Sequence, residues 1–304
     1  MEQRVESGVL ACIVNGRAGS RTAERLAADL PNLFRKHGSR AEVIVTGRGA
    51  DLTTIARRYA KQGYRAIVAA GGDGTVNAVA SAVIGTQSAL GVLPMGTLNH
   101  FAKDAGIPLS LDAAVETIVA GHIASVDAAE VNGHFFVNNS SFGLYPAIVA
   151  HRSSLQRRGM GKWRAFTIAV WRMLRRTPHF HVSLQADGGF DRSERTPFVF
   201  VGNNPYRAAG FGIGARHSLD TGKLWVCTAP GAGRKALAGM MMRALLGRTT
   251  PGELRVLEAE ELWISTRRRR RVKVANDGEL LRIQSPLHYR IHPRALRVFV
   301  PAPG

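Results

Sequence analysis

The sequence contains few cysteines and no long apolar run. Its 304 residues include two cysteines, Cys12 and Cys227, which share no metal-ligand spacing. Both lie in apolar, strand-like contexts, which predicts buried thiols without a catalytic role. No uninterrupted apolar stretch approaches the ~18 residues that a membrane-spanning helix requires. The first residues, MEQRVESGVLACIVNG, place acidic side chains ahead of a short apolar stretch, which predicts a first strand rather than a signal peptide, and a cytoplasmic protein.

Low-complexity tracts and internal repeats are also lacking, so the composition indicates an ordered globular protein. Hydrophobic residues make up 45% of the chain and charged residues 21%. Because 304 residues exceed the size at which one hydrophobic core usually stops growing, we expect two domains.

The charge is unevenly distributed along the chain, whose formal net charge is +19. Residues 1–125 contain 13 Lys and Arg against 10 Asp and Glu, whereas residues 126–304 contain 28 against 12. An almost neutral half followed by a strongly basic one predicts that the second half faces an anionic partner, either nucleic acid or acidic lipid headgroups. A generally arginine-rich proteome is the alternative explanation.

The first 125 residues alternate β-type and helical patterns. Apolar runs typical of strands begin at Val9, Ala41, Arg65 and Ala89. Between the first two runs, apolar residues recur at helical spacing over residues 20–37, and Gly38 would end that helix. Asp51 is a candidate cap for a further helix that ends at Gly63. This alternation predicts a Rossmann-like α/β domain, with a mostly parallel sheet covered by helices on both faces.

From about Val126 the pattern changes to short, strand-like runs separated by turns. These runs predict a second, antiparallel β-rich domain of sandwich-like architecture over residues 126–304, whose last strand could return to the first domain. Helical stretches are expected near residues 162–176 and 234–246. No flexible linker is evident, so the boundary near residue 125 rests on the change of pattern alone.

Two glycine-rich turns follow strands of the first domain and predict phosphate binding. In AAGGDGTVNAVASA, starting at Ala69, an apolar strand runs into glycines and then into a helical pattern. Glycine lets the backbone turn sharply and approach a ligand closely, and free N–H groups at the helix start favour an anion. GVLPMGTLNHFAKDAGIP, starting at Gly91, again ends a strand in a Gly-Thr turn. Both turns would lie at the same sheet edge, where open α/β sheets bind ligands.

Neither turn matches the P-loop or the dinucleotide-binding fingerprint, and a strand-to-helix turn with only a structural role is the alternative. GGDGT followed by Gly-Thr-x-Asn resembles the diacylglycerol kinase catalytic domain superfamily, which includes sphingosine kinases and bacterial soluble lipid kinases. The resemblance covers nearly the whole chain, because further family segments are similar to NGRAG from Asn15, VDAAEVNG from Val126, LDTGKL from Leu219 and NDGE from Asn276. NAD kinases and phosphofructokinases use loops like GGDGT, but the ordered set is more specific.

The resemblance implies an ATP-dependent kinase that uses Mg²⁺ and transfers the γ-phosphoryl group to a lipid hydroxyl, diacylglycerol-like or related. The implied nucleotide-binding residues are Asn15, Thr46, Gly71, Gly72, Gly74, Thr75, Gly96, Thr97 and Asn99. Asp73 and Asp127 would organise magnesium, and a structural magnesium would be held by Leu219, Asp220 and Leu224. Asp277 is the implied general base, with Glu279 as an auxiliary carboxylate; in sphingosine-kinase-like relatives the counterpart of Asp73 takes that role. An ordinary hairpin turn is the alternative interpretation of residues 276–278.

Two residues depart from the family pattern. Ala78 stands where relatives usually have Glu, and His100 where they usually have Asp. Because imidazole is a poor substitute for oxygen around a hard cation, His100 predicts weaker magnesium binding.

Two other functions therefore stay open. One is an NAD kinase-like enzyme, although the Asn-Glu and Asn-Asp acceptor motif of NAD kinases is not recognisable here. The other is a catalytically inactive, basic protein that binds nucleotide or lipid.

The lipid-binding end is predicted from charge and amphipathicity. Residues 160–176 place Trp, Phe, Val and Leu near one helical face, with Lys and Arg among them. Such a helix can lie on an anionic bilayer or pack its apolar stripe into the second domain. The run Arg267 to Arg271 is expected to form one edge strand and its turn, with a solvated, phosphate-attracting face. We therefore expect a lipid substrate, peripheral association with the inner, anionic membrane surface, and no specific nucleic-acid partner.

Overall fold

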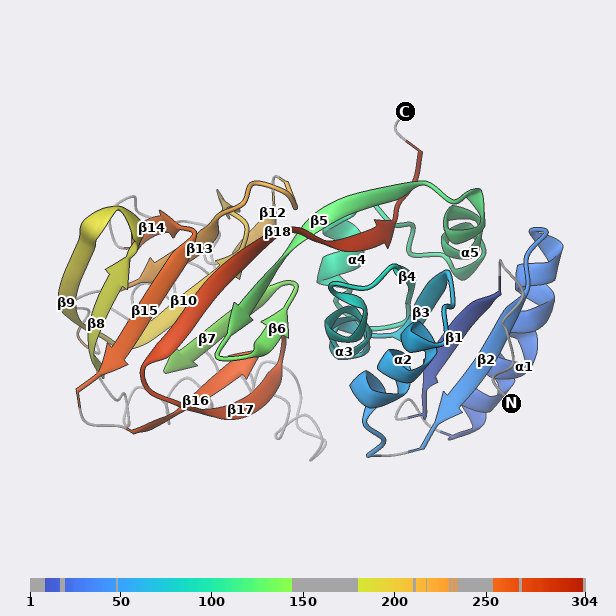
Figure 1. The fold of residues 1–304 in the computed structure, drawn as a ribbon, viewed down its shortest axis with the longest axis horizontal. Helices are drawn as coiled ribbons and strands as arrows, with labels where there is room; N and C mark the ends of the chain where they lie inside the picture. Colours follow the sequence, from blue (N-terminus) through green and yellow to red (C-terminus); the bar gives the residue numbers. More distant parts are fainter. Residues whose placement is uncertain are drawn as a thin grey trace. The chain divides into compact units, whose positions relative to one another are not determined.

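A computed structural model describes residues 9–16, 20–47, 49–143, 180–209, 212–216, 218–229, 231, 233, 254–267 and 270–302 (Figure 1). Contacts within the chain divide it into two units. Unit 1 comprises Met1–Ala128 with His292–Gly304, and unit 2 comprises Ala129–Ile291. The helices expected near residues 162–176 and 234–246, including the amphipathic one, lie outside the described residues.

Unit 1 is built on a parallel sheet. Its strands follow the order β2-β1-β3-β4, with the bounds β1 Leu10–Asn15, β2 Ala41–Thr46, β3 Ala66–Gly71 and β4 Ala89–Pro94. Neighbouring strands in this order are parallel. Every residue of β3 and β4 is buried, which requires cover on both faces of the sheet. The last part of β18 (Leu287–Phe299) extends the sheet, because Val298 pairs in parallel with Leu90.

Helices cover this sheet. Their bounds are α1 Ser20–Lys36, α2 Leu52–Lys61, α3 Asp73–Val83, α4 His100–Asp104 and α5 Leu111–Ala120. Helix α1 packs against α5, and α2 packs against α3 (Figure 1). Asp51 caps α2 by accepting the Thr54 N–H at 3.1 Å, and Gly38 follows α1 with φ 81°. The α/β fold predicted for this half is confirmed. Within the described residues, no helix has the length and apolar character needed to span a bilayer.

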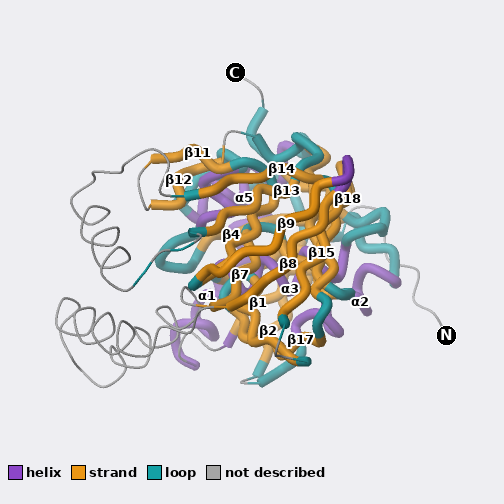
Figure 2. The backbone as a smooth tube through the Cα atoms, turned by 90° about the vertical axis from the view of Figure 1, so that its left-hand side faces the viewer, coloured by secondary structure: helices purple, strands orange, loops and turns teal. Residues whose placement is uncertain are grey.

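Unit 2 consists of antiparallel strands. One sheet has the order β18-β15-β8-β9, with β5 paired to β18 and β6 paired to β5, and Figure 2 shows β15, β8 and β9 side by side. A second sheet has the order β14-β13-β10-β7-β16-β17, and β11 pairs with β12. The bounds are β5 Ile123–Val131, β6 His134–Phe136, β7 Asn139–Gly143, β8 Phe180–Ala186, β9 Phe190–Thr196, β10 Phe198–Asn203, β11 Tyr206–Ala209, β12 Gly212–Arg216, β13 Leu224–Thr228, β14 Arg255–Ala259, β15 Glu261–Thr266, β16 Arg271–Asn276 and β17 Glu279–Gln284.

The two larger sheets of unit 2 share one core. Leu262 and Tyr289 from the first sheet and Phe142 and Val274 from the second belong to the same buried hydrophobic cluster. Apolar side chains that alternate with polar ones on each strand provide these inner faces. The predicted antiparallel, sandwich-like architecture is therefore confirmed.

The prediction that residues 267–271 form one edge strand and its turn is wrong about the edge strand. Arg267 lies in the turn after β15, and Arg271 is the first residue of β16. Strand β15 lies between β18 and β8, and β16 lies between β7 and β17, so neither is at an edge. An alternating sequence pattern identifies a strand but not its neighbours, which distant segments supply.

Candidate active site

The turn after β3 in unit 1 presents backbone N–H groups. Strand β3 ends at Gly71, Gly72 takes the N-cap position of α3, and Asp73 is the first helical residue. No side chain of the described residues caps this helix, and the Thr75 N–H donates to the Gly72 carbonyl at 2.8 Å. The Asp73 and Gly74 N–H groups are therefore the candidate donors to an anion. Gly74 in the same turn is exposed. The strand-to-helix turn expected from the sequence is present, and phosphate binding there stays a prediction.

The two glycine-rich turns lie in contact. A Cβ atom on Gly96 would lie 2.7 Å from the Cα atom of Gly72, so a side chain at Gly96 would force the turns apart. Asn99, in the left-handed region with φ 50°, closes the second turn. Its side chain accepts the Gly96 N–H at 2.9 Å and donates to the Gly96 carbonyl at 2.9 Å. Asn99 thus shapes the turn, and Thr97 within it is exposed.

Two further residues that were predicted to bind nucleotide make hydrogen bonds within unit 1, at the ends of β1 and β2. Asn15, at the end of β1, donates from Nδ2 to the Thr75 hydroxyl at 2.8 Å. This bond ties the first strand to the first turn of α3. Thr46, at the end of β2, is buried, and its hydroxyl donates to the Val14 carbonyl at 3.2 Å. In this structure Thr46 therefore holds β2 to β1.

The carboxylates Asp73 and Asp127 each accept a backbone N–H group. Asp73 Oδ1 accepts from Phe101 at 3.4 Å, which links the start of α3 to α4. Asp127 is 1% exposed in β5, and its Oδ1 accepts from Arg294 at 2.8 Å. His100, the residue that departs from the family pattern, is the exposed first residue of α4. Both acids are fixed in orientation by these bonds.

Asp277 lies at the tip of the β16–β17 hairpin in unit 2, and backbone donors surround its carboxylate. Its oxygens accept the N–H groups of Val137 at 2.7 Å, Asn138 at 3.0 Å and Asn139 at 2.8 Å. Its own N–H donates to the Asn139 carbonyl at 2.9 Å. Because Asp277 and the following Gly278 both have positive φ, 45° and 84°, the hairpin-turn interpretation holds for the backbone as well.

Arg216 supports the segment that binds Asp277. The Arg216 residue is 5% exposed and donates to the Val137 and Asn203 carbonyls and, at 3.0 Å, to Asn138 Oδ1. Its guanidinium lies over the Tyr206 ring at 5.8 Å. A buried arginine that makes these contacts fixes the 137–139 backbone, whose N–H groups therefore stay directed at the carboxylate.

Opposing effects set the protonation of Asp277. Burial disfavours the carboxylate and raises the pKa of Asp277 from 3.8 to about 6, although backbone N–H groups and the Arg216 guanidinium act to lower it. Loss of hydration outweighs the favourable contacts. Glu279, the predicted auxiliary carboxylate, is exposed at the start of β17.

The loop predicted to hold a structural magnesium is organised by polar side chains. The Ser218 hydroxyl bonds to the exposed Asp220 carboxylate. Asn204 Oδ1 accepts the Thr221 N–H at 2.9 Å and its hydroxyl at 2.6 Å, and the Asn204 N–H donates to the Lys223 carbonyl. The loop is anchored at each end by buried apolar residues, Leu219 and Leu224.

Sequence reasoning missed the polar residues that support Asp277. Asn138, Asn203 and Arg216 are all buried, and Asn203 donates to the Val137 carbonyl at 3.1 Å. Tyr206 donates to the Asn138 carbonyl at 2.9 Å. One available signal is that two Asn-Asn pairs directly follow apolar runs, at residues 138–139 and 203–204, where buried amides need fixed partners.

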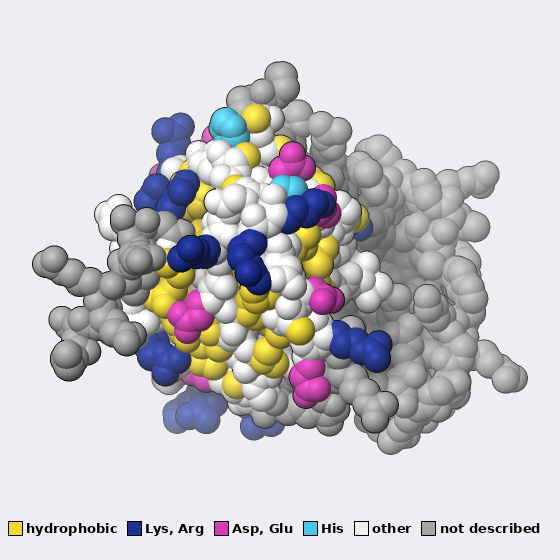
Figure 3. Space-filling view, turned by 90° about the vertical axis from the view of Figure 1, so that its right-hand side faces the viewer, with side chains coloured by type: hydrophobic (Ala, Val, Ile, Leu, Met, Phe, Trp, Pro, Cys, Tyr) yellow, Lys and Arg dark blue, Asp and Glu magenta, His cyan; other side chains and the backbone are white. Residues whose placement is uncertain are grey.

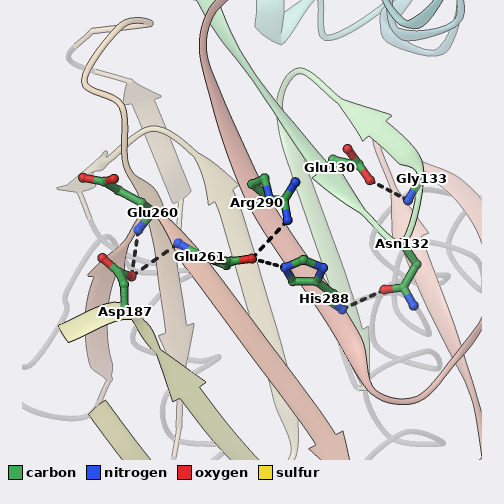
Figure 4. A network of polar contacts seen from close by, with 8 residues as sticks. All are labelled: Glu130, Asn132, Gly133, Asp187, Glu260, Glu261, His288 and Arg290. Carbon is green, nitrogen blue, oxygen red and sulfur yellow. Dashed lines mark hydrogen bonds and ion pairs between the residues drawn. The ribbon is translucent and has the colours of Figure 1, made fainter. Parts of the chain in front are cut away.

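A polar network on β15 and β18 was also not predicted. Glu261 accepts from His288 at 2.5 Å and from Arg290 at 3.2 Å (Figure 4). These contacts, His288 first and Arg290 second, lower the pKa of Glu261. The His288 ring stacks on Trp263 with centroids 3.6 Å apart, and the backbone N–H of His288 donates to Asn132 Oδ1 at 2.7 Å. These partners belong to unit 2 itself, which indicates a role in stabilising the sheet.

Solved structures share this fold. A diacylglycerol kinase from Bacillus anthracis matches with a TM-score of 0.69 at 19% identity, over 97% of each chain. An NAD kinase from Archaeoglobus fulgidus, in complex with ATP, matches with a TM-score of 0.52 at 11% identity, over 95% of this chain and 93% of that one. The fold therefore places the chain among proteins that join an α/β domain to a β-rich domain.

Two protein-family models match consecutive parts of the chain and identify the family more closely than the fold does. Residues 9–131 match the diacylglycerol kinase catalytic domain, and residues 141–300 match the YegS C-terminal NAD kinase beta sandwich-like domain. The chain belongs to the diacylglycerol kinase catalytic domain family, in the form that carries a YegS-type second domain. The resemblance inferred from the sequence is confirmed.

Curated relatives carry matching names. A probable lipid kinase YegS-like from Yersinia enterocolitica is 28% identical over 95% of this chain and 96% of its own length. A diacylglycerol kinase from Staphylococcus saprophyticus is 28% identical, and the match spans 62% of this chain and 62% of that relative.

Proposed function

We propose that this chain is an ATP-dependent lipid kinase that transfers the γ-phosphoryl group to the hydroxyl of a diacylglycerol-like lipid at the cytoplasmic membrane surface. Membership of a kinase family supports phosphoryl transfer. The observation that carries the proposal is the Asp277 carboxylate, which backbone N–H groups of residues 137–139 hold in place at the hairpin tip. Burial also raises the pKa of Asp277 to about 6. A general base works best when its pKa lies near the operating pH.

Asp277 would act on the acceptor hydroxyl. As the hydroxyl oxygen bonds to the γ-phosphorus, the O–H bond breaks and its proton passes to the Asp277 carboxylate, while the bond between the phosphorus and the ADP oxygen breaks. Because the carboxylate must be ionised, the rate should rise as the pH increases through about 6. The Val137–Asn139 N–H groups would hold the carboxylate in place, and Asp73 is the rival base.

The unit 1 turns would bind the nucleotide. Gly72, Gly74 and Gly96 offer backbone close to a phosphate without side chains in the way. Asp73 and Asp127 supply carboxylate oxygens, the donors that magnesium prefers, and bound magnesium would neutralise phosphate charge. The 218–224 loop, with the exposed Asp220 carboxylate, would hold the structural magnesium.

Two other functions have support from particular observations. The fold shared with an NAD kinase favours an NAD kinase-like enzyme. A catalytically inactive binding protein is favoured by His100, which lies at the start of α4 where relatives usually have an acid. Acceptor specificity and turnover separate these functions from a lipid kinase.

The test measures ATP consumption by the full chain with detergent-dispersed diacylglycerol, a sphingoid base, phosphatidylglycerol and NAD. We expect a lipid acceptor to be phosphorylated, and Asp277→Asn to lower that rate ~10²-fold or more. The matched control is Asp191→Asn on the exposed face of β9, where the side chain accepts only from Gln185 among the described contacts. Phosphorylation of NAD alone, or nucleotide binding without turnover on any acceptor, would refute the lipid kinase assignment.

A further inference from the structure

The β16–β17 hairpin presents a basic outer face. In the strand register Lys273 lies opposite Arg282, and Arg271 lies two residues away on the same side. The alternate residues Val272 and Val274 point into the core. All three basic residues are exposed. Lys273 and Arg282 therefore face each other across the strand pair, and a like-charged pair in this position destabilises a sheet.

The three cations have no acidic partner in the part of the chain that the structure describes. Glu279, the nearest acid on β17, lies on the opposite side by strand alternation. Other cations of the described residues do have acidic partners, such as Lys36 with Asp112 at 2.8 Å in unit 1 and Lys223 with Glu260 at 2.7 Å in unit 2. On the face of unit 1 drawn in Figure 3, Lys and Arg side chains are interspersed with Asp and Glu.

An exposed leucine adjoins these cations. Leu280 is 54% exposed and lies opposite Ala275, on the same side as Lys273 and Arg282 and next to the hairpin turn. An apolar side chain beside a cluster of cations suits the boundary between headgroups and acyl chains. Asp277, at the tip, is four residues from Lys273, or ~13 Å along an extended strand.

We propose that the outer face of the β16–β17 hairpin, formed by Arg271, Lys273, Leu280 and Arg282, is the surface that binds an anionic phospholipid leaflet. This inference deepens the proposed function and rests on it, because it places the base candidate Asp277 beside the lipid layer that holds the acceptor hydroxyl. The cations contact headgroup phosphates, and Leu280 enters the apolar boundary.

The need to prevent pairing at a sheet edge explains only one of the three cations on this face. Charged residues on an edge strand prevent pairing with another chain, and β17 is an edge strand, which accounts for Arg282. Strand β16 is paired on both sides, so Arg271 and Lys273 have no edge to protect. An acid opposite Arg282 would give the same solubility with a favourable cross-strand pair. The retained repulsion fits a surface selected for an anionic partner.

Lys273→Glu separates binding from folding. The substitution replaces a like-charged pair with an opposite-charged pair, so the melting temperature should be equal to that of the wild type or higher. Because each cation near an anionic leaflet contributes a factor of ~5 and the new acid is repelled, affinity for the leaflet should fall ~25-fold. The control is Arg195→Glu on exposed β9, which changes net charge equally and should change affinity less than ~3-fold.

The experiment is co-sedimentation of the full chain with phosphatidylglycerol-containing or neutral phosphatidylcholine vesicles across a salt series, with duplex DNA as competitor. We expect binding to anionic vesicles that is weakened by salt and by Lys273→Glu. Leu280→Ser should reduce the vesicle binding that remains at high salt, because that binding depends on apolar burial. Equal losses for Lys273→Glu and Arg195→Glu, equal binding to both vesicle types, or binding to DNA alone would overturn the proposal. Turnover on detergent-dispersed diacylglycerol is measured separately, so its absence would overturn the proposed function while the binding result stands.

Discussion

Asp277→Asn tests which of two opposing effects controls the pKa of this half-buried carboxyl group. Burial raises its pKa from 3.8 to about 6, while three backbone N–H groups and Arg216 act in the other direction. Between these pH values the folded chain keeps a proton that the unfolded chain releases. The contribution of Asp277 to the free energy of unfolding is therefore fully present below pH 3.8 and lost as the pH rises through about 6.

The magnitude follows from the shift. At about 1.4 kcal/mol per pKa unit, a rise from 3.8 to about 6 corresponds to about 3 kcal/mol. Asparagine keeps the shape of the side chain but does not ionise in this range. Because part of this change is complete at pH 4, the free energy of unfolding of the wild type minus that of Asp277→Asn should fall by about 2 kcal/mol between pH 4 and pH 7.

Urea unfolding at constant ionic strength from pH 4 to pH 8 measures this difference, in which the other carboxylates cancel. Asp112→Asn is a control of opposite sign, because Lys36 and His37 lower the pKa of Asp112. The stability that Asp112 contributes is present above about pH 3.8 and is lost only as the pH falls below it, so from pH 4 to pH 8 this difference should stay nearly level. A difference curve for Asp277 that stays level or rises from pH 4 to pH 7 would refute the reasoning, since it would show that the N–H groups and Arg216 offset or outweigh burial.

Three further substitutions test the unit 1 turns. Asp73→Asn should leave the melting temperature unchanged and remove nearly all ATP turnover; more than about a tenth of wild-type activity would contradict its role. His100→Asp should lower the magnesium concentration at half-maximal rate, and an unchanged dependence would show that the site is built around histidine. Gly96→Ala places a Cβ atom 2.7 Å from the Gly72 Cα atom. It should weaken ATP binding, measured calorimetrically, and destabilise unit 1 by about 1–3 kcal/mol; unchanged ATP affinity would show that contact between the turns is not needed.

Local sequence patterns were sufficient for the α/β half. Helix and strand periods, the Asp51 cap and Gly38 act within a few residues, so the elements from Leu10 to Pro94 follow from the sequence. The glycines of the two turns after β3 and β4 were visible for the same reason. The contact between Gly72 and Gly96 joins two turns, and the tertiary structure alone shows it.

The sequence by itself was sufficient to suggest an Asp-Gly hairpin turn at Asp277 as one interpretation, because such a turn is defined locally by two residues with positive φ. Only the tertiary structure decided its chemistry. The donors at Val137–Asn139 are about 140 positions away in the chain, and Arg216 comes from another strand. Burial and pKa depend on which distant segments meet, and strand pairing, not local spacing, brings them together. The same pairing set Lys273 opposite Arg282 and gave the hairpin its basic face.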